Sequence, residues 1–238
     1  RRSQLVVPFG VGAMIDFKDE TWMSAGLNHW PSEKHPSKKA PIIEATQILD
    51  QRLQARLTSL LKRKSAIRYF LQPTIQAKFG SRRAPENYDM PFVRFPGWHF
   101  CSRCKRMKWL SLTTRKIPLC ESQKGNGKKC NGKLTPIRFL IACENGHISD
   151  FPWKSWIKCT CEKSDKFRFT STARPGLDGI LIKCDDCKKQ RSMRSSMGMQ
   201  DSQELKKALR DARCPGEKPW LLDKNDIDHC DAEVSTIQ

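Results

Sequence analysis

Eleven cysteines and one nearby histidine are the residues of this 238-residue chain whose types and spacing could do chemistry. Cys101 and Cys104 form one Cys-x2-Cys pair, and Cys184 and Cys187 form another. Two cysteines at this spacing on a tight turn point both sulfurs at one centre, which suits a metal better than a structural disulfide. The odd number of cysteines also disfavours a secreted disulfide scaffold, and Pro8 interrupts the short apolar run that could otherwise serve as a signal peptide.

The spacing of the cysteines divides eight of them into two groups of four. The first group is Cys101, Cys104, Cys120 and Cys130, and the second is Cys184, Cys187, Cys214 and Cys230. Four thiolates suit tetrahedral Zn²⁺, a borderline-soft metal without redox chemistry. Because four protein ligands leave no position for a substrate water, we predict two structural zinc sites whose binding energy contributes directly to folding.

The remaining metal-type ligands lie in the segment CENGHISDFPWKSWIKCTC. Cys143, His147, Cys159 and Cys161 would complete a third zinc site with three cysteines and one histidine, although their Cys-x3-His and Cys-x-Cys spacings are less standard. Two alternatives stay open. His147 could order a loop by hydrogen bonding while the thiols are simply buried, or a zinc ion with fewer protein ligands could be catalytic.

The catalytic patterns that a sequence can reveal are missing here, so we expect no enzyme and no catalytic residue. The glycine-rich start does not match the GxGxxG dinucleotide fingerprint, and KGNGKK at 124–129 lacks the spacing and the Ser/Thr of a phosphate-binding loop. The zinc-deaminase pattern is absent, since Ile148 and Ser149 follow His147. A thioredoxin-like role for CSRC would leave the other cysteines of its group unexplained.

An excess of positive charge points to an anionic partner. The chain carries 44 Lys and Arg against 25 Asp and Glu, a formal net charge of +19. Residues 52–83 contain nine basic residues and no acid, and residues 103–133 contain ten basic residues with Glu121 as their one acid. Nucleic acid is the simplest partner for such a chain. The best candidates for phosphate contacts, strung through the first cysteine turn, are Arg103, Lys105, Arg106 and Lys108.

Tryptophans lie among the same segments and could stack on bases, as aromatic side chains do in proteins that bind single strands. We expect them instead to pack around the cysteine turns or against a partner; they are Trp98, Trp109, Trp153 and Trp156. Alternatively, the basic residues form a solvated surface that only keeps the protein soluble.

Hydrophobic periodicity predicts few regular elements. Leucines at helical spacing between cations predict a helix over 44–71, ended by Pro73, and a second helix is expected at about 201–212. From residue 99 onward, short apolar stretches alternate with cysteine turns, which is typical of short strands. We therefore predict an α+β fold, a loop-rich and zinc-stapled domain, with a basic helical region at 1–98 and a zinc-knuckle region at 99–238. No stretch approaches the roughly 18 apolar residues of a membrane helix.

Five blocks of the sequence carry a resemblance in aggregate. They are RRSQLVVPFGVGAMIDF at 1–17, RFPGWHFCSRC at 94–104, FLIACENGHISDFPWKSWI at 139–157, GLDGILIKCDDC at 176–187 and RCPGEKPWL at 213–221. Together they resemble the DrmB family of the bacterial DISARM anti-phage defence system, and the resemblance extends to the region of Cys230. One departure is Lys158, which stands where the family often has a histidine and leaves Cys159 and Cys161 as substitute ligands of the third site.

The resemblance implies a non-catalytic accessory subunit that partners a helicase-like ATPase, DrmA, and helps to engage DNA with single-stranded character. ATP hydrolysis would then belong to the partner. The resemblance also implies a cytoplasmic protein, and a chain that continues into a C-terminal domain after residue 238. Two further interpretations stand beside it: a free-standing zinc-binding protein of nucleic acids, and a purely architectural scaffold subunit.

Overall fold

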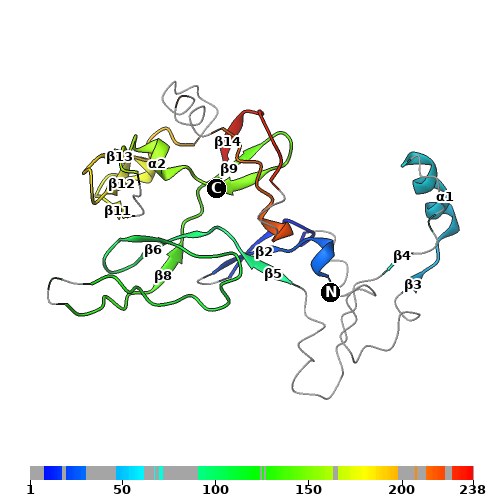
Figure 1. Ribbon diagram of the computed structural model, residues 1–238, viewed down its shortest axis with the longest axis horizontal. Coiled ribbons are helices and arrows are strands. Elements are labelled where there is room, and N and C mark those ends of the chain that lie inside the picture. Colours follow the sequence, from blue (N-terminus) through cyan, green and yellow to red (C-terminus); the bar gives the residue numbers. More distant parts are fainter. Residues whose placement is uncertain are drawn as a thin grey trace, which may run out of the picture.

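Small antiparallel sheets joined by loops and turns make up the fold, with few helices among them (Figure 1). The computed structural model describes residues 8–17, 20–30, 47–61, 67, 70–71, 91–123, 125, 127–162, 166–197, 207, 213–222 and 227–237. The predicted α+β, loop-rich fold is confirmed. The predicted boundary at residue 98 stays a prediction.

No described helix combines the length and the apolar character needed to cross a membrane.

Among the described residues, four sheets have three strands each and a fifth has two. The strand orders are β1 (Met14–Asp16), β2 (Thr21–Ser24) and β5 (Phe92–Arg94) in the first sheet, and β7 (Met107–Trp109), β6 (Trp98–Cys101) and β8 (Leu134–Pro136) in the second. The third sheet contains β10 (Ile148–Asp150), β9 (Leu140–Cys143) and β14 (Val234–Ile237), and the fourth contains β11 (Phe167–Ser171), β12 (Ile180–Cys184) and β13 (Gln190–Ser192). The two-stranded sheet pairs β3 (Gln47–Ile48) with β4 (Phe70–Leu71).

Helix α1 (Gln51–Leu60) is shorter than the helix predicted over 44–71, so that prediction is wrong in its extent. The helix begins after Asp50, whose side chain accepts a hydrogen bond from the Leu53 N–H at 2.9 Å. Before and after the helix, β3 and β4 pair with each other, and a residue held in a strand ladder cannot also extend the helix. None of the residues of α1 is buried, so its apolar positions do not pack as their spacing predicts.

The other helices whose bounds the structure describes are single turns: α2 (Trp153–Trp156), η2 (Leu27–His29), η5 (Gly176–Gly179) and η6 (Pro219–Leu221). The predicted second helix at 201–212 lies outside the described residues except for Lys207.

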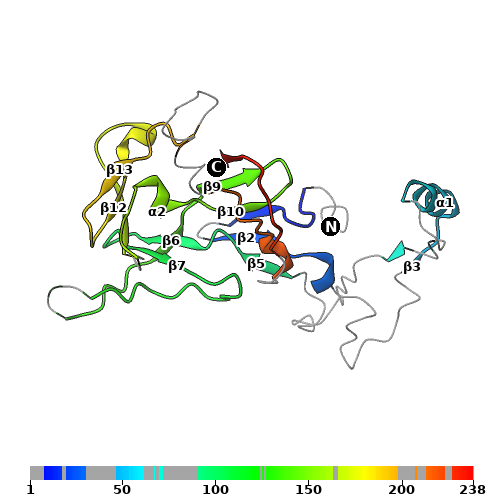
Figure 2. The same ribbon diagram turned by 45° about the horizontal axis from the view of Figure 1, so that its top comes forward.

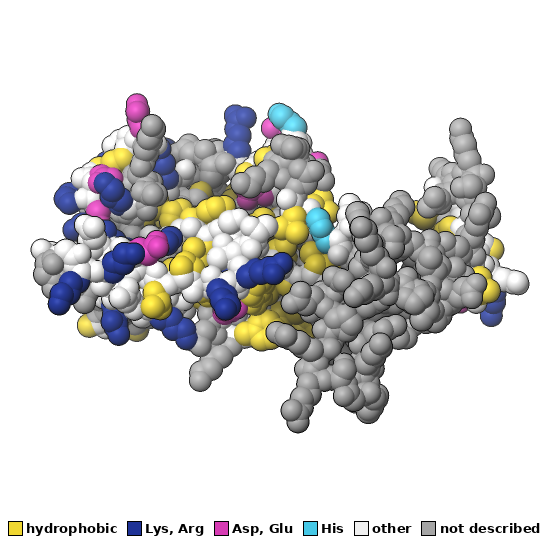
Figure 3. Space-filling model, turned by 60° about the horizontal axis from the view of Figure 1, so that its bottom comes forward, with side chains coloured by type: hydrophobic (Ala, Val, Ile, Leu, Met, Phe, Trp, Pro, Cys, Tyr) yellow, Lys and Arg dark blue, Asp and Glu magenta, His cyan; other side chains and the backbone are white. Residues whose placement is uncertain are grey.

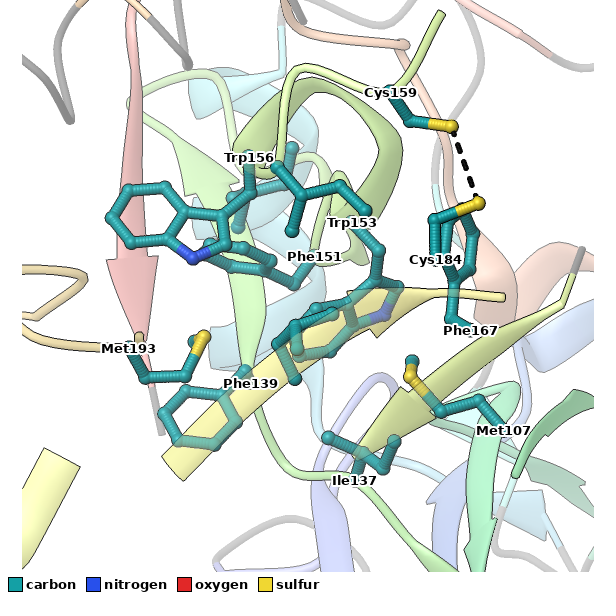
Figure 4. Packing of buried hydrophobic residues seen from close by; sticks show 13 residues of the cluster. Met107, Ile137, Phe139, Phe151, Trp153, Trp156, Cys159, Phe167, Cys184 and Met193 are labelled. Atoms are coloured by element: carbon teal, nitrogen blue, oxygen red, sulfur yellow. Dashed lines mark hydrogen bonds between the residues drawn. The ribbon is translucent and has the colours of Figure 1, made fainter. Parts of the chain in front are cut away.

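The main core gathers side chains from segments far apart in the chain (Figure 4). Trp153 and Trp156, both on α2, are 2% and 0% exposed. Phe139 stands edge-on to Trp153, with ring centroids 6.2 Å apart, a favourable arrangement for two aromatic rings. Cys159 and Cys184 are members of the same cluster. The main core and one group of candidate metal ligands therefore share residues.

A second, smaller core lies under the sheet of β1, β2 and β5, and Figure 2 shows this sheet beside η6. Its buried members include Met23, Val93 and Phe95, with Trp220 of η6 packed against them. The Gly26 N–H donates a hydrogen bond to the Trp220 carbonyl at 2.7 Å. The N-terminal sheet is thus fastened to a segment almost two hundred residues further along the chain.

Asp150, at the end of β10, ties three segments together. Its carboxylate accepts hydrogen bonds from the backbone N–H groups of Gly97 at 3.1 Å and Trp98 at 3.4 Å, and from the indole Nε1–H of Trp109 at 3.2 Å. Glycine is needed at position 97, because a Cβ there would collide with the Trp109 indole and the Asp150 carboxylate. Burial outweighs these hydrogen bonds and raises the pKa of Asp150 to about 6.

We predict that Asp150 titrates near pH 6 in the folded protein, which carboxyl ¹³C shifts measure by NMR. The folded pKa lies above that of an unfolded chain, about 4, so the folded state keeps the proton longer. The contribution of Asp150 to the free energy of unfolding is therefore largest at low pH and is lost as the pH rises through the folded pKa. Trp109→Phe removes a donor to the ionised carboxylate and should move the midpoint higher. A midpoint near 4 in the intact protein would contradict this account.

Candidate metal centres

Three groups of four metal-type ligands meet in space, each with all its ligand atoms within 4.8 Å of one another. The groups are Cys101, Cys104, Cys120 and Cys130; Cys143, His147, Cys214 and Cys230; and Cys159, Cys161, Cys184 and Cys187. We call them the Cys101 site, the His147 site and the Cys159 site. All twelve residues predicted from the sequence as ligands fall into one of the three.

The grouping predicted from spacing agrees with the structure for the Cys101 site and is wrong for the other two. Cys184 and Cys187 do not join Cys214 and Cys230; they meet Cys159 and Cys161. The pair of Cys214 and Cys230 meets Cys143 and His147 instead. The prediction joined ligands that follow one another in the chain, whereas the strand pairing brings together ligands from more distant segments.

The separations between ligand atoms match the edges of a tetrahedron around a metal ion. Sulfurs bound at the usual Zn–S distance of about 2.3 Å lie about 3.8 Å apart in a tetrahedral site. The observed Sγ–Sγ distances are 3.7 Å for Cys101–Cys130, 3.6 Å for Cys104–Cys120, 3.7 Å for Cys159–Cys184, 3.6 Å for Cys159–Cys187 and 3.9 Å for Cys143–Cys230. A disulfide needs about 2.05 Å, and all eleven cysteines are free. The donor set and its spacing fit Zn²⁺ in each group.

The Cys101 site is built on the turn between β6 and β7. The Cys101 N–H donates to the Arg106 carbonyl at 2.9 Å, which closes the turn, and Lys105 adopts a left-handed conformation with φ 62°. Cys120 and Cys130 come from the long loop that leads from β7 to β8. Gly132 lets this loop approach, because a Cβ there would collide with the Cys101 sulfur.

The Cys159 site repeats the same turn between β12 and β13. The Cys184 N–H donates to the Lys189 carbonyl at 2.9 Å, and Lys188 has φ 63°. The other two ligands follow α2, whose buried tryptophans fix where Cys159 and Cys161 emerge from the main core. The guanidinium of Arg191 on β13 lies 3.8 Å above the Trp156 ring and links the turn to the helix.

The His147 site uses a related turn between β9 and β10, which is shorter by one residue although its two ligands are spaced one residue further apart. The Cys143 N–H donates to the His147 carbonyl at 3.1 Å, and Gly146, with φ 82°, allows the tighter path. Cys214 and Cys230 come from two segments that touch at Gly216, where a Cβ would collide with the Asp228 backbone.

His147 is oriented by a residue that the sequence did not suggest. Its Nδ1 lies 3.4 Å from Cys143 Sγ and 3.6 Å from Cys214 Sγ, so this nitrogen faces the ligand cluster. Its Nε2–H donates to the Asp228 carboxylate at 3.1 Å, and Lys218 lies 2.7 Å from the same carboxylate. A carboxylate behind a metal-binding histidine fixes the ring and its tautomer. No feature of the sequence distinguishes Asp228 from its neighbouring aspartates.

Without a metal, at least one thiol in each group resists ionisation, whereas hydrogen bonds outweigh burial and lower the pKa of Cys120 to about 7 and that of Cys230 to about 6. Desolvation raises the pKa of Cys104, Cys161 and Cys214 to about 12. The hydrogen bond to Asp228 raises the pKa of His147. A metal ion must displace these protons, so metal binding should weaken as the pH falls.

The residues predicted to contact phosphates differ in whether an acidic side chain of the protein already pairs with them. Arg106 and Lys108 form ion pairs, at 3.6 Å with Asp185 and 2.7 Å with Glu121. Arg103 is exposed, and its guanidinium lies 3.5 Å from the Cys130 carbonyl. That these residues and Lys105 contact phosphates stays a prediction.

Burial decides which tryptophans are accessible to a ligand. Trp153 and Trp156 are 2% and 0% exposed, too deeply buried for a base to stack on them. They pack in the main core, as expected. Trp98 is half-buried against the same core, and Trp109 is 47% exposed.

Comparison with known proteins places the chain in a family. Residues 1–238 match the family described as "Domain of unknown function (DUF8724)". The chain belongs to this family. It is also 32% identical over 155 residues to "DISARM protein DrmB" of Bacillus paralicheniformis. That match covers 63% of this chain but 26% of the relative, so the chain spans only part of the relative's length. The resemblance to the DrmB family is confirmed.

We predict that Gly132→Ala removes the metal from the Cys101 site, because the added Cβ would displace the Cys101 sulfur. Zinc per chain, measured by elemental analysis, should fall by about one equivalent. Gly125→Ala is the matched control, since a Cβ there meets nothing within 4 Å. Full zinc content in Gly132→Ala would show that the loop does not pack as described.

We further predict that ligand substitutions are non-additive within a site and additive between sites. His147→Ala and Cys214→Ser should each lose about one zinc equivalent, and so should the double variant, because both residues serve one ion. His147→Ala combined with Cys184→Ser should lose about two. If the grouping predicted from spacing held instead, His147 and Cys214 would serve different ions, and their double variant would lose about two equivalents in place of one.

Proposed function

We propose that this chain is the zinc-stapled part of a non-catalytic DISARM defence subunit that works beside a helicase-like ATPase and holds DNA of single-stranded character. The observation that carries the proposal is the set of three complete four-ligand groups, in a chain similar to a DrmB protein. The similarity supports the defence role, and the ligand groups support the structural one.

The ligand sets favour a structural role for the metals. Each group supplies four protein ligands, and a site of this kind has no coordination position left for a substrate. Three cysteines with one histidine, or four cysteines, are the donors that zinc prefers in such sites. We propose zinc at all three groups, and ATP hydrolysis in the partner subunit.

The surface charge supports contact with nucleic acid. Lys and Arg side chains are spread over the face shown in Figure 3, and acidic side chains lie among them. The net charge of +19 favours a polyanion. Contacts of this kind bind phosphates without reading the base sequence.

We predict that the zinc-loaded chain binds a single-stranded oligonucleotide with an affinity that falls as salt rises, by about 0.7 logarithmic units per tenfold salt for each phosphate contact. Fluorescence anisotropy over a salt series measures the slope. A neutral-backbone oligonucleotide of the same sequence is the control and should bind at least about tenfold more weakly. The measurement is repeated with the helicase-like ATPase present.

Each outcome separates one interpretation from the others. Binding that appears only with the ATPase keeps the defence-subunit proposal and assigns the DNA contact to the complex. Equal or tighter binding of structured RNA supports a free-standing nucleic-acid protein. Negligible binding under all conditions supports an architectural scaffold and contradicts the proposed DNA contact.

A further inference from the structure

A pocket of about 540 Å³ beside the Cys101 site has a strongly basic lining. Its charged residues are Arg103, Arg115, Lys116, Lys133 and Glu20. We call it the basic pocket. One wall is the first cysteine turn, and the other is the loop that leads from β7 to Cys120. Only Arg103 among the four predicted phosphate contacts lines this pocket.

Glu20, the acidic residue in the lining of the basic pocket, already has partners within the protein. Glu20 Oε2 accepts a hydrogen bond from the Trp22 indole at 2.8 Å and lies 3.6 Å from the guanidinium of Arg94. Arg94 is fully buried, with its guanidinium 4.3 Å above the Trp22 ring. The positive charge of the pocket lining therefore has little to offset it on the side of Glu20.

Arg94 also builds the outer wall of the pocket. Its Nε–H donates to the Thr114 carbonyl at 2.8 Å, and one terminal nitrogen donates to the Arg115 carbonyl at 3.0 Å. Breaking these bonds would leave a buried charge without its partners, which costs much free energy. The bonds therefore hold this loop firmly. The backbone that carries Arg115 and Lys116 is thus tied to β5.

The inner wall is held by the Cys101 site. The Ser102 N–H donates to the Lys133 carbonyl at 3.0 Å, which joins the cysteine turn to the segment before β8. Asn131, with φ 50°, turns the chain between Cys130 and Gly132. Hydrogen bonds therefore hold the backbone of both walls in place.

Three cations of the basic pocket differ from their neighbours in their pairing. Within the part of the chain that the structure describes, no carboxylate lies within ion-pairing distance of Arg103, Arg115 or Lys116, whereas Arg106 and Lys108 have acidic partners. Unpaired guanidiniums in a concave site match the oxygens of a phosphate. Leu119, 57% exposed in the same lining, offers an apolar contact for a sugar.

We propose that the basic pocket binds the sugar-phosphate backbone of a nucleic acid, with Arg103, Arg115 and Lys116 as the phosphate contacts. This inference rests on the proposed DNA contact and assigns it to one place. An acidic segment of a partner protein is the competing ligand. The pairing of forked guanidiniums with an apolar contact favours a phosphodiester linked to a sugar.

The test compares two double variants that remove the same charge. Arg115→Ala/Lys116→Ala empties the outer wall, and Lys166→Ala/Arg174→Ala removes two cations outside the pocket that are paired with Asp186 and Asp178. Affinity for a single-stranded oligonucleotide is measured by anisotropy over a salt series, with zinc content confirming that each variant is intact. The first variant should bind at least about tenfold more weakly, with a salt slope shallower by about 1.4, while the second should change less than about twofold. The variant Arg115→Lys/Lys116→Arg keeps both positive charges and should bind the oligonucleotide as the unmodified chain does.

Each result leads to a different conclusion. Equal losses in both double variants, or none in either, overturn the pocket while leaving the proposed DNA contact in place. Absence of binding by the unmodified chain, with and without the ATPase, overturns both. Displacement of the oligonucleotide by poly-glutamate of equal charge as readily as by a second oligonucleotide would assign the pocket to an acidic protein segment and overturn the nucleic-acid assignment.

Discussion

The meeting of four ligand atoms at tetrahedral distances is the constraint on which the rest of the structure depends. The sheets are small, with at most three strands in each of those described, and sheets of this size are marginal without further support. Around the Cys101 site, the buried cluster consists of three cysteines with Leu110 and Leu134. So few apolar side chains cannot hold a long loop by burial, and a bound ion would supply what they lack.

The ligands of one site are nested in the sequence between the ligands of another. The Cys159 site lies wholly between the two halves of the His147 site in the sequence, since its ligands fall between His147 and Cys214. The entropy of closing a loop grows only slowly with its length, so the wide span of the His147 site adds little cost. In return, that site joins the turn between β9 and β10 to the segment that also fastens the N-terminal sheet through Gly26 and Trp220.

The tryptophans of α2 and the cations of the basic pocket occupy different parts of the molecule. The tryptophans of α2 lie in the main core, where they set the position of a ligand pair, and are not available to stack on bases. Arg94 is the exception among the cations that the structure describes: it is buried, and it orders the loop that presents Arg115 and Lys116. The interior thus builds a fixed frame, and the exposed cations placed on it form the surface that we propose for phosphates.

The sequence by itself determined the kind of chemistry. The residue types and the local spacing of Cys101 with Cys104 and of Cys184 with Cys187 predicted ligand turns, because such a turn is set by a few adjacent residues. The family and the α+β class were also predictable. Only the tertiary structure decided which turns share an ion, where Asp228 lies and where α1 ends. Those outcomes depend on strand pairing and close contacts between distant segments, as at Gly216 against Asp228, which local spacing does not record.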